Sequence, residues 1–377
     1  MENKGRKYLI ILWLAFLAAP LLNNVLHIIK SKDLEGAVQV SPDVTFSIEG
    51  WLSGVYQQDK EKYFNDNFGF RSDLIRVHNQ LGYSLFDKLN AKSVVLGKDN
   101  YLFEKGYIDA YYGGNFIGDS LIDDRIRKIQ ILSDTFASMG KKMIVVLAPS
   151  KVRFYPDKIP DSLRKTVLPG NYERYSQHLK LSGKQVFDCN KYFDFIRDTS
   201  RYSLFTQYGT HWSMYGAGLV KDSLQHIIAL ETSTPEAHPL RTFHINKLPE
   251  YTDADIGEAL NLIEQLKGGP YIYPTYTLPE NYKKIPLRLV SISDSFFWSM
   301  IYLNFPSMYE SCQFWYYFNE IWPDRFLPDG RKMAVADLNL KSEIDNTDVF
   351  IIMVSEVNMS LTGFNFIDQA YDLYCKK

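Results

Sequence analysis

Two short segments of the chain contain residues that together can do nucleophilic chemistry. The segment YGTHWSMYGAG places His211 between glycines, and VSISDSFF places Ser295 after an apolar run, where a helix is predicted to begin. A neutral imidazole can take the proton of a serine hydroxyl, and a serine activated in this way attacks acyl groups. If the fold brings the two side chains together, the sequence predicts acyl transfer.

Each of these residues also has an ordinary structural interpretation. Ser and Asp are preferred helix caps, so Ser293 or Asp294 would cap the helix that begins near Ser295. His211 would then be an exposed or hydrogen-bonded loop histidine. The catalytic interpretation depends on the pair, because a serine on a strand-to-helix turn is also surrounded by unpaired backbone N–H groups that suit an oxyanion.

Three further residues are candidates for substrate binding: Lys151, Trp212 and Asp294. Lys151 follows the apolar run that ends at Pro149, so it is expected at the edge of a sheet, where it would hold an anionic sugar or donor group. The ordinary alternative is a solvated lysine. Trp212 and Asp294 are neighbours of the candidate base and nucleophile.

Composition excludes several classes of protein. The chain of 377 residues has 42 basic and 44 acidic residues in no long like-charge run, which argues against a nucleic-acid partner. No metal or cofactor is expected, because HExxH, Asp/His ladders and glycine-rich phosphate loops are all missing from the sequence. The three cysteines have no metal-ligand spacing and allow at most one disulfide.

The first thirty residues predict an export signal. MENKGRK is basic, and residues 8 to 29 supply 22 mostly apolar residues before Lys30, where about 20 are needed to span a bilayer. We expect an uncleaved signal anchor over residues 1–30, with the basic end in the cytoplasm and the rest of the chain outside. A cleaved signal peptide and a buried core helix are the alternatives. A polar linker is expected over 31–46 and a single catalytic domain over 47–377.

Helices alternating with short apolar strands predict an α/β fold. Two helical stretches broken at DNFGFR precede a hairpin at SVVLGKDNYLF, and a helix is expected over 119–139, ending at Gly140. Strands are expected at KKMIVVLAP, KQVFD, IPLRLVSIS and TDVFIIMV. This order indicates a mostly parallel central sheet covered by helices on both faces.

The chain resembles the alginate O-acetyltransferase AlgJ/AlgX-like family, whose catalytic domain is SGNH-hydrolase-like. The resemblance covers about residues 50 to 300 and rests on six motifs in the family's order and approximate spacing: FNDNFGFRSDLIRVHNQL, VVLGKDNYLF, VVLAPSKVRFYPDKIP, YGTHWSMYGAG, DADIGEALNL and SISDSFF. It implies an SGNH-hydrolase-like α/β/α sandwich in which the histidine motif precedes the serine motif, as it does here.

The resemblance also implies roles for individual residues and partners. Ser295 matches the nucleophile of the family's GDSF-like motif, and His211 matches the base of its DTHW motif. Ser295 would accept an acetyl group from a donor presented by a membrane-bound O-acyltransferase and pass it to a hydroxyl of an exported polysaccharide. The expected location is the cell membrane, with the catalytic domain on the periplasmic side.

The sequence departs from the family pattern in two places. Ser293 replaces the glycine of the serine motif, and Gly209 stands where the family has the acid of DTHW. Loss of the acid's function costs about 10^4 in turnover in serine proteases. Either another carboxylate replaces it, with Asp188 and Asp255 as candidates, or a dyad suffices, or the site is inactive. Placing Asp at 209 should raise the rate if the loop tolerates a side chain.

Three functions therefore remain open at this point. The leading hypothesis is an extracytoplasmic, membrane-anchored O-acetyltransferase of a polysaccharide. The second is a carbohydrate esterase that releases acetate to water. The third is a catalytically silent polysaccharide-binding or scaffold subunit, an alternative that depends on Gly209.

Overall fold

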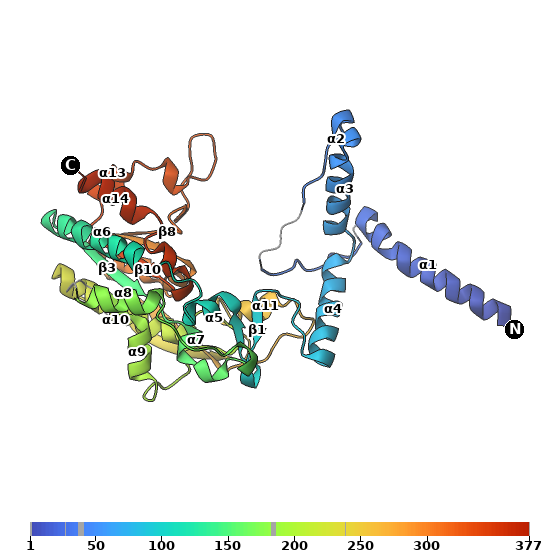
Figure 1. Cartoon of the computed structure of the whole chain (residues 1–377), viewed down its shortest axis with the longest axis horizontal. Coiled ribbons are helices and arrows are strands. Elements are labelled where there is room, and N and C mark those ends of the chain that lie inside the picture. Colours follow the sequence, from blue (N-terminus) through green and yellow to red (C-terminus); the bar gives the residue numbers. More distant parts are fainter. Residues whose placement is uncertain (1, 27, 37–40, 182–185, 238, 377) are drawn as a thin grey trace. The chain divides into compact units, whose positions relative to one another are not determined.

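The computed structural model describes the chain except for residues 1, 27, 37–40, 182–185, 238 and 377. It contains two compact units (Figure 1). Unit 1 comprises Met1–Lys92 and Gly257–Leu266, and unit 2 comprises Ser93–Ile256 and Lys267–Lys377. The boundaries drawn from the sequence at residues 30 and 46 remain predictions, and part of the expected linker, 37–40, lies outside the described residues.

Unit 1 is helical in its described part. Its helices are α1 Glu2–Leu26, α2 Ile48–Ser53, α3 Val55–Asp66 and α4 Arg71–Phe86. Gly54, with φ of 82°, separates α2 from α3 because a left-handed residue ends a helix. The predicted interruption at DNFGFR is confirmed, since α3 ends at Asp66 and α4 begins at Arg71.

Helix α1 is long and apolar enough to cross a membrane. Its segment Gly5–Asn24 has a mean hydropathy of 1.5 and no buried residue. A signal sequence near an N-terminus has the same properties. The helix ends at Leu26, so the final part of the expected span over 8–29 is not helical where it is described, and residue 27 lies outside the described residues.

The centre of unit 2 is a six-stranded sheet in the order β4-β3-β10-β7-β8-β9. Strands β4 to β8 in this order run parallel, and β9 is antiparallel to β8. The predicted mostly parallel sheet is confirmed, although β8 and β9 were not expected and residues 184–185 of KQVFD lie outside the described residues. The strands are β3 Lys142–Leu147, β4 Val186–Asp188, β7 Ile285–Ser293, β8 Tyr309–Tyr316, β9 Glu320–Trp322 and β10 Val349–Val354.

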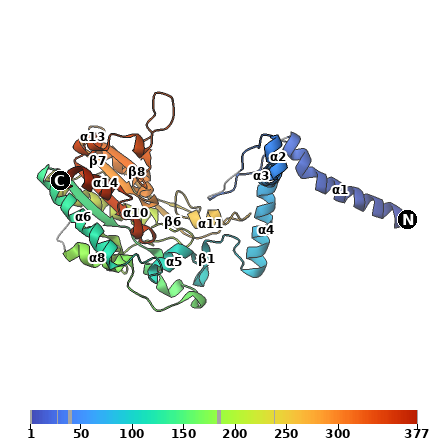
Figure 2. The ribbon, with the colours of Figure 1, turned by 45° about the horizontal axis from the view of Figure 1, so that its top comes forward.

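Helices cover both faces of this sheet (Figure 2). Successive side chains of a strand point to opposite faces. In β10 the alternate residues Val349, Ile351 and Met353 belong to one core cluster, and the residues between them belong to the other. The first cluster includes residues of α7 Lys151–Phe154, α9 Cys189–Ile196, α10 Met214–Thr232 and α12 Trp298–Tyr302. The second includes residues of α6 Asp119–Ser138, α8 Asn171–Leu181, α13 Leu340–Asp345 and α14 Phe366–Tyr374.

Smaller elements lie outside the central sheet. The predicted hairpin is present as β1 Val94–Leu96 and β2 Leu102–Glu104, followed by α5 Lys105–Tyr111. A second pair consists of β5 Leu240–Asn246 and β6 Tyr271–Thr277. A single 3-10 turn, η4 Ser295–Phe297, links β7 to α12, and the short helix α11 spans Asp255–Ala259.

Candidate active site

Ser295 lies on the turn between β7 and α12, as expected. Strand β7 ends at Ser293, and the buried Asp294 caps η4 by accepting a hydrogen bond from the Phe296 N–H at 3.2 Å. The other oxygen of Asp294 accepts from the Ser355 N–H at 2.8 Å and from Asn358 Nδ2 at 3.0 Å. Ser355 directly follows β10, so Asp294 ties the serine turn to the carboxyl edge of the sheet.

The His211 loop is fixed at both ends. A β-bridge joins Phe205 to Trp212, and Ser213 caps α10 by accepting from the Gly216 N–H at 3.0 Å. The indole Nε1 of Trp212 donates to Ser299 Oγ of α12 at 2.9 Å. The loop therefore has little freedom to move relative to the helix that follows Ser295.

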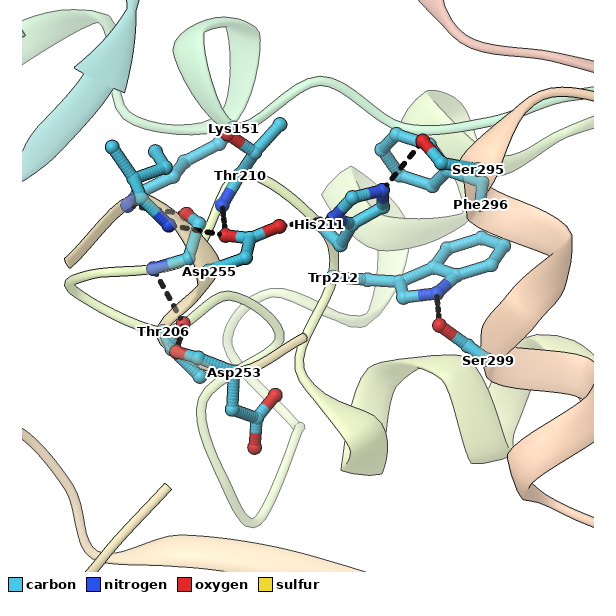
Figure 3. Close-up of polar contacts among 12 residues, drawn as sticks. Lys151, Thr206, Thr210, His211, Trp212, Asp253, Asp255, Ser295, Phe296 and Ser299 are labelled. Atoms are coloured by element: carbon cyan, nitrogen blue, oxygen red, sulfur yellow. Dashed lines mark hydrogen bonds and ion pairs between the residues drawn. The ribbon is translucent and has the colours of Figure 1, made fainter. Parts of the chain in front are cut away.

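These two elements bring the predicted pair together (Figure 3). His211 Nε2 lies 2.8 Å from Ser295 Oγ, within the reach of proton transfer. His211 is 8% exposed and Ser295 is partly exposed. The geometry is that of a nucleophile and its base, open to a reactant on one side.

A carboxylate completes the constellation from a distant segment. Asp255 Oδ2 lies 2.5 Å from His211 Nδ1, on the opposite side of the ring from Ser295 (Figure 3). Its Oδ1 accepts from the N–H groups of Thr210 at 2.7 Å and Ile256 at 2.8 Å. Asp255 was one of two candidates for this position. The other, Asp188, caps α9 and accepts from Ser176 and Tyr172 instead.

The structure explains why residue 209 is a glycine. A Cβ at Gly209 would lie 2.8 Å from the Thr252 carbonyl oxygen and 3.0 Å from that of Asp253, and 2.7 Å from Thr206 Oγ1. Real Cβ atoms do not approach backbone oxygens this closely, so the segment that carries Asp255 occupies the space of a side chain at 209. The condition for activation by Asp at 209, a loop that tolerates a side chain, is not met.

Lys151 is buried, which disagrees with the predicted role in substrate binding. It is 3% exposed, and its Nζ donates to the carbonyl oxygens of Leu102, Gln207 and Gly209, each at 2.8 Å. Burial lowers the pKa of Lys151 to about 7, opposed by the charge of Asp255. Three carbonyl acceptors nevertheless require the three N–H donors of an ammonium, so these contacts favour the charged form. Lys151 fixes the backbone just before His211.

Trp212 and Asp294 do not contact substrate either. Both side chains are 0% exposed, so neither offers a surface to a sugar. Trp212 packs edge-on against Phe296, with ring centroids 5.1 Å apart. Both residues instead hold the two catalytic candidates in place. Burial of both side chains disagrees with the predicted role in substrate binding.

The charges around His211 favour its protonated form. Burial by itself lowers the pKa of the imidazole, but the charge and hydrogen bond of Asp255 outweigh it, so the pKa of His211 is raised above its ordinary value. Glu104, at the end of β2, was not singled out from the sequence. Burial, and then the negative charge of Asp255, raise the pKa of this carboxyl. No local pattern marks Glu104, because Thr210 and Asp255, which affect its carboxyl, come from distant parts of the chain.

Neither His211 nor Ser295 lines the cavity of about 660 Å³ found in unit 2, whose lining includes Tyr101, Tyr155, Arg201 and Tyr202. Ser295 is partly exposed, but not to that cavity. Among the described residues, no group of three or more His, Cys, Asp or Glu side chains is arranged to hold a metal ion.

The fold and the site define a class: an α/β/α domain with a serine, histidine and carboxylate at the carboxyl edge of a mostly parallel sheet. The family model described as "SGNH hydrolase-like domain, acetyltransferase AlgX" matches residues 94–286, just over half of the chain. The chain belongs to this family.

The chain is also similar to several known proteins. A probable alginate O-acetylase AlgJ of Pseudomonas syringae pv. tomato is 24% identical over 178 residues, covering 47% of this chain and 44% of that protein. The chain spans about half the length of the curated relatives it matches. The solved O-acetyltransferase domain of Pseudomonas putida AlgJ is 14% identical, with a TM-score of 0.47 over 74% of this chain and 98% of that one. Bacillus cereus PatB1 is 13% identical, with a TM-score of 0.47 over 72% and 99%.

Proposed function

We propose that the chain is an O-acetyltransferase that carries acetyl groups on Ser295 and transfers them to hydroxyls of a polysaccharide. The observation that supports this most directly is the continuous set of contacts from Asp255 through His211 to Ser295. Membership of the acetyltransferase AlgX family supports the same chemistry. The catalytic residues are Ser295 as nucleophile, His211 as base and Asp255 as the acid that orients it.

The reaction takes place in two steps, acylation of Ser295 and transfer of the acetyl group to the glycan. Ser295 Oγ attacks the acetyl carbonyl of the donor while His211 Nε2 takes the hydroxyl proton, and the donor group leaves with that proton as the acetyl–serine bond forms. A glycan hydroxyl then gives its proton to His211 and attacks the acetyl carbon, and Ser295 leaves and recovers the proton. Asp255 keeps the proton of His211 on Nδ1, so that Nε2 is free to act as base.

Charge develops on the acetyl oxygen in both steps. The Ser295 N–H is at the first position of η4, where a helix supplies no carbonyl partner, so it is our candidate donor to this oxygen. Asp294 already occupies the next N–H, that of Phe296.

The acceptor, donor and location extend this proposal. Relatives named as probable alginate O-acetylases support an exported polysaccharide as acceptor. A membrane-bound O-acyltransferase would present the acetyl donor. Helix α1, with its apolar segment Gly5–Asn24, supports a single-pass anchor with residues 31–46 as linker and 47–377 outside the cytoplasm.

The two alternatives differ in what they need from the site. The silent scaffold depended on the missing acid at Gly209, and the Asp255 carboxylate beside His211 removes that reason. The esterase uses the same acyl-enzyme but passes the acetyl group to water. The acceptor therefore distinguishes esterase from transferase.

The test is to trap the intermediate. The purified protein, incubated with p-nitrophenyl acetate, should gain the mass of one acetyl group on the peptide that contains Ser295. Ser295→Ala should abolish the gain, and His211→Ala should lower the rate by a factor on the order of 10^4 or more. If no activated ester acylates Ser295 of the wild-type protein, the scaffold function replaces this proposal.

A further inference from the structure

A row of partly exposed and exposed aromatic side chains continues the helix face that carries Ser295. Along η4 and α12, Trp298 and Tyr302 follow Ser295 at spacings of three and four residues, so all three lie on one face. Ser295 and Trp298 are partly exposed and Tyr302 is 43% exposed. The residues between them are mostly buried: Phe296, Phe297, Ser299 and Met300. Ser295 therefore looks out along an aromatic surface.

A tyrosine from another segment extends this surface. Tyr251 stacks on Tyr302, with ring centroids 4.7 Å apart and an angle of 27° between the ring planes. Trp298 and Tyr302 are also near-parallel, at 25° and 6.4 Å. Tyr251 is 52% exposed, although large aromatic side chains are usually buried. We call Tyr251, Trp298 and Tyr302 the aromatic ledge.

The backbone at Tyr251 adds a second observation. Its φ is 54°, a conformation that costs free energy for a residue with a bulky side chain. Folding would ordinarily avoid this cost at an exposed position. This conformation accompanies the contact of the Tyr251 ring with Tyr302.

We propose that the aromatic ledge is the acceptor subsite and binds sugar rings of the glycan beside Ser295. This inference rests on the proposed function. The face of an aromatic ring is electron-rich, and the C–H bonds on the face of a pyranose are weakly positive, so the two faces attract each other. Trp298 lies one turn from Ser295 and Tyr302 lies two turns from it, about 10 Å along the helix, so sugar rings stacked on the ledge would lie beside the nucleophile.

The exposure of Tyr251 and Tyr302 and the partial exposure of Ser295 favour a polymer over a small molecule. Enclosed pockets bury most of a small ligand. The cavity of about 660 Å³ is lined by neither Ser295 nor any residue of the ledge. A polymer that lies across the ledge can bring an internal sugar to Ser295 without threading a chain end into a pocket. The alternative occupant is the protein that delivers the acetyl group, because Tyr and Trp are also frequent at protein interfaces.

The test separates the two half-reactions in the full-length chain. Tyr302→Ala should leave acylation by p-nitrophenyl acetate unchanged, because that small ester needs only the catalytic residues. Transfer from the acyl-enzyme to oligosaccharides of de-acetylated alginate, cellulose or chitin should show a KM raised about 2- to 10-fold for the lost ring. Tyr302→Phe, which keeps the ring, should restore the wild-type KM. Phe195→Ala, which removes an 85% exposed aromatic ring from α9, is the matched control and should change neither step.

Other results would overturn this inference or the proposed function, and they can be told apart. An unchanged KM in Tyr302→Ala overturns the inference, as does equal loss of both half-reactions, which would indicate a structural ring. A wild-type acyl-enzyme that reacts only with water, or a Tyr302→Ala chain impaired only in acetylation by the membrane-bound donor partner, overturns it in favour of an esterase or a protein-docking surface. Failure of the wild type to acylate at all contradicts the proposed function itself.

Discussion

At the scale of single residues, the carboxylate that serves His211 comes from a different place in the chain than the family motif supplies. Gly209 has no side chain, and Asp255, 44 positions after His211, makes the contact with Nδ1. Two backbone N–H groups hold the other oxygen of this carboxylate, so its orientation does not depend on substrate. The site therefore has the three groups of a serine acyl-transfer triad.

The first prediction concerns Asp255 and pH. His211 accepts a proton only when neutral, and its pKa is raised, so the wild-type acylation rate should rise with pH through an inflection above the ordinary value of 6.5. In Asp255→Asn the burial that lowers the pKa of the imidazole remains while the charge that raises it is lost. The inflection should therefore move to lower pH, and the maximal rate should fall by up to about 10^4 because the tautomer is no longer fixed.

A matched control is Asp188→Asn, which removes the other candidate carboxylate from its contacts with Tyr172 and Ser176. Its pH–rate profile should keep the wild-type inflection. Measurement of acylation by p-nitrophenyl acetate between mildly acidic and mildly alkaline pH distinguishes the two. An inflection that stays in place in Asp255→Asn would remove Asp255 from its proposed role.

At the scale of elements, the site depends on the close approach of two loops. The loop before α10 carries His211, and Asp255 is the first residue of α11. Thr206 Oγ1 donates to the Asp253 carbonyl at 2.5 Å, and Asp253 Oδ1 accepts from the Met214 N–H at 3.1 Å. The glycine at 209 permits this approach, and Lys151 holds the carbonyls on the other side.

The second prediction tests this packing with the smallest possible side chain. Gly209→Ala should lower the free energy of unfolding of unit 2 by about 1–3 kcal/mol through overpacking, and the urea midpoint should fall accordingly. It should also reduce the acylation rate, because Asp255 is pushed away from His211. Gly209→Asp should be at least as damaging, although it restores the family's acid. Circular dichroism during urea unfolding and acylation by p-nitrophenyl acetate measure the two effects.

The control for a glycine-to-alanine change is Gly82→Ala in α4. A Cβ there meets its nearest neighbours, Asn90 Nδ2 and the Lys88 carbonyl oxygen, at an ordinary 3.4 Å. Gly82→Ala should raise the free energy of unfolding by up to about 1 kcal/mol, because alanine favours a helix more than glycine does, and should leave the acylation rate unchanged. A Gly209→Ala protein as stable and active as this control would contradict the steric explanation.

At the scale of the whole molecule, the proposed location of the chemistry depends on the N-terminal helix. Segment Gly5–Asn24 is apolar and contains no buried residue. Exposed apolar surface of this extent is costly in water, and a bilayer removes the cost. The proposed location outside the cytoplasm rests on this helix and on the basic residues that precede its apolar part.

The third prediction is that the full chain fractionates with membranes, resists extraction by high salt and is cleaved by protease added from outside the cytoplasm. Leu14→Arg, near the middle of the span, should weaken membrane retention, because an arginine at that depth costs about 2.5–3.5 kcal/mol. Leu14→Ile is the matched control and should be retained like wild type. Recovery of a soluble product that begins after residue 22 would show a cleaved signal instead.

The sequence by itself determined the features that depend on neighbouring residues. Apolar periodicity predicted α6, which ends at Ser138, just before Gly140. Short apolar runs predicted four of the five parallel strands, β3, β4, β7 and β10, but not β8. The order of the His211 and Ser295 motifs indicated the family. These features are encoded locally, because backbone conformation and the pattern of side-chain faces follow from residues a few positions apart.

Only the tertiary structure decided which groups meet and which are buried. Asp188 and Asp255 were equivalent candidates in the sequence, and the fold placed one of them 2.5 Å from His211. Lys151 and Trp212 were expected to contact substrate, yet segments far away in the chain cover them. The reason is physical: exposure and hydrogen-bond partners are set by packing between distant segments, and no pattern within either segment records that packing.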